Sequence, residues 1–151
     1  MEKRSSNFRE LVWNHEEKNI EIAIELNIPE DKSEEFSTAR YEISLCHDET
    51  KGLVIDKENL FLIKKTIQIT NQKKQKDSFP EEIVTPHCIV TPFNKRPTGW
   101  KKIIGRSPEG IDNYYSETKK KWNLTFQFGA NKSSLAGVPA DETRFAIALW
   151  V

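Results

Sequence analysis

The chain has 151 residues, with 23 Lys and Arg against 23 Asp and Glu, so its formal net charge at pH 7 is zero. This length suits a single domain with a real core, and the charge balance argues against a dedicated nucleic-acid-binding domain, which is usually basic. Charged residues make up 30% of the chain and aromatic residues 10%, which is typical of a globular protein rather than a disordered one.

The compartment follows from what the sequence lacks. Its apolar stretches are far shorter than the ~18 residues that a membrane span needs, and residues 1–6 lead into no apolar signal region. Two cysteines, Cys46 and Cys88, are too few for a disulfide scaffold. We therefore expect a cytoplasmic protein with no membrane partner.

The first predicted elements are a short helix and a strand. Ser5 or Ser6 can cap a helix over residues 8–13, with Phe8, Leu11 and Val12 on one face. Residues 20–28 alternate between apolar and mostly charged or polar side chains, which predicts a strand with one buried face. The side chains expected on that buried face are Ile20, Ile22, Ile24, Leu26 and Ile28.

The next predicted elements are strands joined by short loops. Residues 40–46 and 53–62 read as an antiparallel hairpin whose loop has Gly52 near its end, and residues 65–70 look like a further strand. Prolines between residues 79 and 97 forbid a helix and suit extended coil or edge strands.

Three more strands are predicted towards the C-terminus. They cover residues 100–106, 113–117 and 122–128. In the last of them Trp122, Leu124, Phe126 and Phe128 alternate with polar residues, so all four are expected to face the core.

A helix is predicted to begin near Asp141, with acidic residues in its first turn. Phe145 and Leu149 would face the sheet, whereas Ile147 and Trp150 would need other cover. The chain ends at Val151 with no closing signal for this helix, so we expect a fragment of a larger protein. The alternative is a short amphipathic tail docked back on the domain.

These elements predict an α+β fold: a mostly antiparallel β-sheet with short helices at the two ends, in a single β-rich domain over residues 1–151.

The sequence offers no catalytic or metal site. Cys46-His47 and His87-Cys88 are adjacent pairs, which point to opposite faces of a strand and do not have the spacing of a structural zinc site. Asp112 and Glu117 lie at an odd spacing, so we expect a solvated rim rather than a carboxylate pair.

Basic residues interleave with tryptophan at two places. Such clusters can neutralise phosphates while a ring stacks on a base. The alternative is a lysine-rich turn beside a core tryptophan, and the zero net charge predicts weak or no binding at physiological salt. The candidate nucleic-acid contacts are Trp100, Lys101, Lys102, Lys119, Lys120 and Lys121.

The order of the segments resembles a known family. The segments that carry the likeness are residues 7–12, 20–26, 39–45, 110–117, 135–142 and 145–150. Together they resemble the ABC/SMC-type ATPase heads of bacterial AAA-family ATP-binding proteins, relatives of the RecF-like and OLD-like groups.

The resemblance implies that the chain is the β-rich accessory lobe of such a head, in a DNA-related or phage-defence system. It implies ATP and Mg²⁺ for the parent protein, and as partners the remainder of the ATPase head, a second copy, or DNA bound by the parent. The chain itself lacks the Walker A, signature and Walker B motifs, so the resemblance supplies no catalytic residue and no cofactor here. The alternative is a free-standing protein- or nucleic-acid-binding module that uses its lysine and tryptophan loops.

Overall fold

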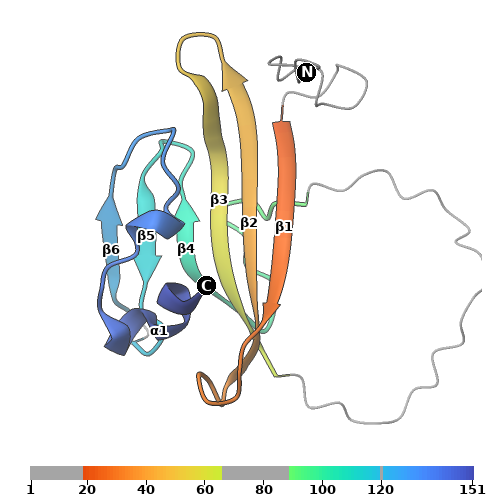
Figure 1. Cartoon of the computed structure of the whole chain (residues 1–151), viewed down its shortest axis with the longest axis vertical. Coiled ribbons are helices and arrows are strands. Elements are labelled where there is room, and N and C mark those ends of the chain that lie inside the picture. Colours follow the sequence, from red (N-terminus) through yellow and green to blue (C-terminus); the bar gives the residue numbers. More distant parts are fainter. Residues whose placement is uncertain (1–18, 66–88, 120) are drawn as a thin grey trace, which may run out of the picture.

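The computed structural model describes residues 19–65, 89–119 and 121–151. In this part of the chain, six strands form one sheet in sequence order, and each neighbouring pair is antiparallel (Figure 1). The predicted antiparallel sheet is therefore confirmed, and the described part of the chain is mainly β. The elements are β1 (Asn19–Asn27), β2 (Phe36–Asp48), β3 (Gly52–Lys64), β4 (Trp100–Arg106), β5 (Asp112–Tyr115), β6 (Asn123–Phe126), the 3₁₀ turn η3 (Leu135–Gly137) and α1 (Glu142–Trp150).

Several predicted elements match closely. β4 has the predicted bounds, and β2 and β3 form the predicted hairpin. The hairpin turn closes because Asp48 Oδ1 accepts hydrogen bonds from the backbone N–H groups of Thr50 and Lys51, both at 2.8 Å, while Gly52 adopts a φ of 75°. The helix predicted over residues 8–13 lies outside the described residues, as does nearly all of the strand predicted over residues 65–70.

The register divides the side chains between two faces of the sheet, because directly opposite residues of an antiparallel pair share a face. One row runs across the sheet through Ile24, Tyr41, Leu60, Ile104 and Tyr114. We call the side that carries this row the helix face, since α1 lies in front of it in Figure 1. The opposite side, which carries Glu42, Asn59 and Phe61, is the loop face.

The cover that the described residues provide lies over one half of each face. On the helix face, Leu60, Ile104 and Tyr114 are fully buried and join one core with Phe145 of α1, so the cover lies over β3, β4 and β5. On the loop face, residues 89–91 lie over β1 to β3, where the buried side chain of Glu42 meets the backbone N–H of Thr91 at 2.7 Å.

This arrangement corrects the burial predicted for β1. Its isoleucines do share the face of the core, but Ile22 and Ile24 are 42% and 49% exposed, because the C-terminal cover ends before it reaches them. Of the five side chains expected to be buried, Ile28 is the one that is, at 6% exposed. On the opposite face, Glu21 is half-buried and accepts the backbone N–H of Ile89 at 2.6 Å.

Helix α1 begins as predicted but does not keep the predicted phase. Asp141 caps it by accepting the backbone N–H of Thr143 at 3.1 Å. Phe145, with φ −134° and ψ 29°, then interrupts the helical geometry. The turn after this kink is rotated, so Ile147 is buried and Leu149 is 41% exposed, contrary to the predicted packing of Leu149. Trp150 is 38% exposed.

The inward face of β6 is also only partly as predicted. Trp122, Leu124 and Phe128 pack against the core, but Phe126 is 39% exposed. Among the described strands β6 lies at the edge of the sheet, so a side chain near its end has a neighbouring strand on one side only.

Candidate functional site

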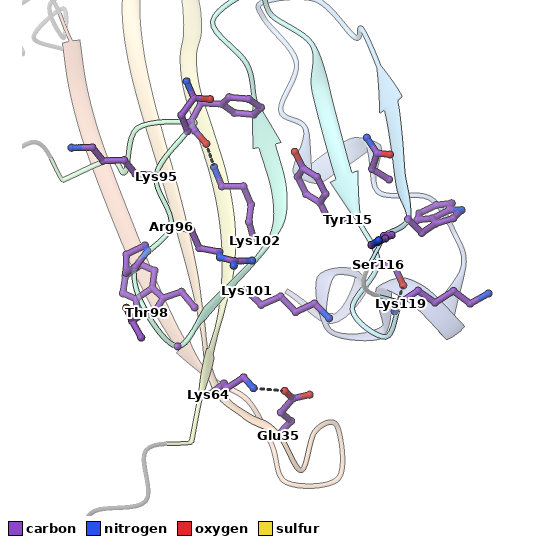
Figure 2. Close-up of a pocket in the computed structure, with 18 residues that line it drawn as sticks. Glu35, Lys64, Lys95, Arg96, Thr98, Lys101, Lys102, Tyr115, Ser116 and Lys119 are labelled. Atoms are coloured by element: carbon purple, nitrogen blue, oxygen red, sulfur yellow. Dashed lines mark hydrogen bonds and ion pairs between the residues drawn. The ribbon is translucent and has the colours of Figure 1, made fainter.

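A basic pocket lies beside β4 and β5, next to the chain segment that precedes β4 (Figure 2). Its volume is about 1040 Å³, and Glu35 is the acidic residue in its lining. Four aromatic side chains also line it: Phe93, Trp100, Tyr115 and Trp122. The cationic side chains of the lining are Lys64, Lys95, Arg96, Lys101, Lys102, Lys119 and Lys121.

The wall before β4 is built from turns that its sequence dictates. Backbone bonds from Lys95 N to Pro92 O at 2.9 Å and from Trp100 N to Pro97 O at 3.1 Å close two successive turns. Gly99 has a φ of 81°, a conformation that side chains with a Cβ rarely adopt, and it delivers the chain into β4. The result is a short wall that presents Lys95 and Arg96.

Buried polar side chains of the loop face hold this wall against the sheet. Glu42, which is fully buried, accepts hydrogen bonds from Thr91 N at 2.7 Å and from Thr91 Oγ1 at 3.1 Å. Asn59 donates from Nδ2 to Thr91 O at 2.8 Å. The Arg40 side chain completes the group through an ion pair of 2.8 Å with Glu42. These contacts fix the start of the wall, and with it the position of the pocket.

The structure brings together the two candidate clusters that are separate in sequence. Trp100, Lys101, Lys102, Lys119 and Lys121 all line the basic pocket, and Lys120 lies outside the described residues.

The ring of Trp100 is already held by neighbours. It packs edge-on against Phe61, with 5.3 Å between ring centroids, and the Arg40 guanidinium lies 5.6 Å from its centroid. Trp100 therefore fits the alternative interpretation, in which a packed tryptophan lies beside lysine residues.

Lys101 and Lys102 are half-buried and make internal contacts. The Lys102 ammonium donates to Phe93 O at 2.7 Å, as Figure 2 shows, and lies 4.8 Å from the centroid of the Phe93 ring. Burial lowers the pKa of Lys102 to about 8, although the nearby charge of Glu42 opposes that shift. The Lys101 ammonium donates to the carbonyl oxygen of Glu117. These two lysines therefore add positive charge to the pocket without extending their side chains into solvent.

The exposed cations of the pocket lie on both sides of Lys101 and Lys102. Lys95 and Arg96 are exposed on the wall, and Lys119 and Lys121 are exposed after β5. Tyr115 lines the pocket from β5 and is half-buried. Exposed ammonium and guanidinium groups around aromatic rings can bind phosphates and stack on planar groups.

Asp112 and Glu117 are buried, so the predicted solvated rim is wrong. Asp112 is fully buried and pairs with Arg106 Nε at 2.7 Å. Glu117 is 9% exposed and accepts the backbone N–H of Ala148 at 2.8 Å. Burial raises the pKa of Glu117, and its backbone hydrogen bonds oppose that rise. The two carboxylates have separate partners and form no pair.

A buried polar network that was not predicted from the sequence lies on the helix face. Glu58, which is fully buried, accepts hydrogen bonds from Tyr41 Oη at 2.8 Å, Ser133 Oγ at 2.5 Å and Ser134 N at 2.8 Å. Arg106 lies between this carboxylate and that of Asp112. Nothing in the local pattern marks these partners, because they lie up to 76 residues apart in the chain. The network ties the segment before α1 to the sheet.

Among the described residues, no three His, Cys, Asp or Glu side chains come together in a way that would hold a metal ion. Cys46 is a half-buried free thiol, and burial raises its pKa, while His87 and Cys88 lie outside the described residues.

Comparison with known families, with curated proteins and with solved structures found no match to this chain. No helix in the described part of the chain is both long and apolar enough to cross a membrane.

Proposed function

We propose that this protein is a non-catalytic module that binds single-stranded nucleic acid through the basic pocket. The observation that carries the proposal is that cations from three parts of the chain line one pocket: Lys95 and Arg96, Lys101 and Lys102, and Lys119 with Lys121. A chain with no net charge gains no long-range attraction for a polyanion, so a local concentration of positive charge is needed for binding.

The chemistry of the lining favours a single strand over a duplex. A single strand has unpaired bases that can stack on aromatic rings, whereas a duplex hides its bases, and Tyr115 lines the same pocket as the exposed lysines. The volume of about 1040 Å³ lies just above the range of about 300–1,000 Å³ for small-molecule pockets, which leaves room for a few nucleotides of a flexible single strand.

Salt dependence tests the proposal. We expect a labelled single strand of about 16 nucleotides to bind at about 50 mM salt and to be largely released at about 200 mM, as measured by fluorescence anisotropy. Reversing two exposed charges, Lys119→Glu with Lys121→Glu, should weaken binding at least tenfold. It should also reduce the log–log salt slope by about 0.7 for each lost phosphate contact.

The matched control reverses two exposed lysines outside the pocket, Lys51→Glu with Lys132→Glu, and so changes the net charge equally. It should leave affinity within about twofold. Equal losses in the two double variants would mean that general charge, not the pocket, drives binding, and would contradict the proposal. Tyr115→Ala should cost about 1–3 kcal/mol of binding free energy if a base stacks there.

A second proposal is that the chain serves as the accessory lobe of a larger ABC/SMC-like ATP-binding protein in the cytoplasm. The exposed side chains of Leu149 and Trp150 at the end of α1 favour it, since apolar groups of this kind gain free energy when a partner covers them.

On this proposal, the chain alone should show no micromolar affinity for Mg-ATP in a calorimetric titration, because its sequence contains no G-x-x-x-x-G-K-[ST] motif. A G-x-x-x-x-G-K-[ST] motif encoded directly upstream would support the proposal. Its absence from the surrounding reading frame would count against it.

A further inference from the structure

Four uncharged polar or aromatic side chains share the loop face of β5 and β6: Asn113, Tyr115, Asn123 and Thr125. They lie on that face because Tyr114, between the first two, belongs to the helix face. The register places Thr125 directly opposite Asn113, and Asn123 directly opposite Tyr115. Tyr115 and Asn123 also line the basic pocket, so this group of side chains continues the pocket along the two strands.

This group is accessible to a ligand in the pocket. Asn123 and Thr125 are exposed, and Asn113 and Tyr115 are half-buried. Asn113 lies two residues before Tyr115, which is about 7 Å along a strand. A strand with one base stacked on Tyr115 therefore brings a base edge within reach of Asn113. Hydrogen bonds to base edges, unlike contacts with phosphates, distinguish one base from another.

The amide of Asn113 has a fixed orientation. Its Nδ2 donates to the backbone oxygen of Gly105 at 3.2 Å and to that of Ile111 at 3.0 Å. Carbonyl oxygens only accept hydrogen bonds, so the nitrogen of the amide must face them, and its two hydrogens are both used. The other branch of the amide is Oδ1, which accepts and cannot donate. Asn113 can therefore offer a ligand an acceptor and no donor.

We propose that Asn113 makes the nucleic-acid site select cytosine over thymine and uracil. This inference rests on the proposed binding of a single strand in the basic pocket. Cytosine carries a donor, its N4 amino group, where thymine carries the acceptor O4. Uracil has the same O4 without the methyl group of thymine. The Asn113 oxygen can bond to the amino group, whereas O4 leaves both oxygens without a hydrogen.

Binding of homopolymer strands to the full chain tests the selection. Labelled oligo(dC), oligo(dT) and oligo(dU), each of about 16 nucleotides, are compared by fluorescence anisotropy near neutral pH and at about 50 mM salt. We expect oligo(dC) to bind about fivefold more tightly than either of the others, which is the effect of one net hydrogen bond. The comparison with oligo(dU) removes the contribution of the thymine methyl group.

Two variants assign the selection to its side chain. Asn113→Ala should bring the affinities for oligo(dC) and oligo(dT) within about twofold of each other, because it removes the acceptor. The ratio is measured on one protein sample, so a general loss of folded protein would weaken both strands alike. Asn131→Ala is the matched control, since Asn131 is exposed and does not line the pocket, and it should keep the wild-type ratio.

The outcomes separate this inference from the proposed function. Equal affinities for oligo(dC) and oligo(dT) in the wild type, with binding still lost in the double variant of Lys119 and Lys121, would overturn the selection by Asn113 and leave the pocket as the binding site. A preference for oligo(dC) that persists in Asn113→Ala would also overturn it. Absence of binding to every strand would refute the proposed function and this inference together.

Discussion

The carboxylate of Glu117 accepts hydrogen bonds from the backbone N–H of Ile147, at 3.0 Å to Oε1 and 3.1 Å to Oε2, although the two residues are 30 positions apart. The kink at Phe145 explains the contact, since it interrupts the helix and leaves the next N–H groups without carbonyl partners one turn earlier. Glu117, from the segment that follows β5, thus acts as a cap for the second part of α1.

We expect Glu117→Ala to lower the free energy of unfolding by about 2–4 kcal/mol, because it leaves buried N–H groups unpaired. Urea titration followed by circular dichroism measures the change. Glu117→Gln keeps the volume and one acceptor oxygen, so it should lose less. The control Glu109→Ala, at an exposed turn, should stay within about 0.5 kcal/mol of the wild type. A loss as small for Glu117→Ala would contradict the capping role.

Arg106 is the cation between two fully buried carboxylates, those of Glu58 and Asp112. Arg106→Met should destabilise the fold by about 3–5 kcal/mol, because it leaves buried negative charges without their partner. Arg144→Met serves as the comparison, since its ion pair with Asp141 is about a third exposed and such pairs contribute about 0–1 kcal/mol. Similar midpoints for the two variants in a denaturant titration would argue against a stabilising network.

Lys102 makes stability depend on pH in a predictable direction. Its pKa is about 8 in the folded chain and near 10.5 when unfolded, so between these values the unfolded chain binds more protons. This site should therefore make the fold more stable as pH rises from 8 to 10.5. The stability of the wild type relative to Lys102→Met should increase across that window, in denaturant titrations at successive pH values.

Lys95→Met provides the control, because Lys95 is exposed, and its curve should run parallel to that of the wild type.

Deprotonation of the Lys102 ammonium should also change the affinity for nucleic acid. Loss of the Lys102 charge above pH 8 should weaken polyanion binding between pH 7 and 9 in the wild type and not in Lys102→Met. A pH-independent affinity in the wild type would remove Lys102 from the binding potential.

Gly137 lies where no side chain fits. A Cβ placed there would approach Phe128 Cε2 to 2.5 Å and Tyr114 Oη to 2.9 Å. Gly137→Ala should cost about 1–3 kcal/mol through overpacking, as measured by thermal unfolding. Ala136→Ser, at the exposed neighbouring position, should change the midpoint little. An unchanged midpoint in Gly137→Ala would mean that the turn η3 can move away from the sheet.

The sequence by itself determined the elements whose signals are local. Period-two alternation placed the isoleucines of β1 on the side of the core, and the hairpin signals predicted the pairing of β2 with β3. The helix start at Asp141 was equally readable, because a cap depends on residues within one turn. The cationic clusters at residues 100–102 and 119–121 were visible as composition alone.

Only the tertiary structure decided what covers each side chain. Alternation says which side of a sheet a residue faces, but the cover comes from segments far away in the chain. In the part of this chain that the structure describes, that cover lies over one half of each face. For the same reason Ile24 lies exposed, while Glu117 is buried against a helix 30 residues later. The basic pocket likewise exists because antiparallel pairing and the wall before β4 bring separate lysine clusters together, which no local pattern can specify.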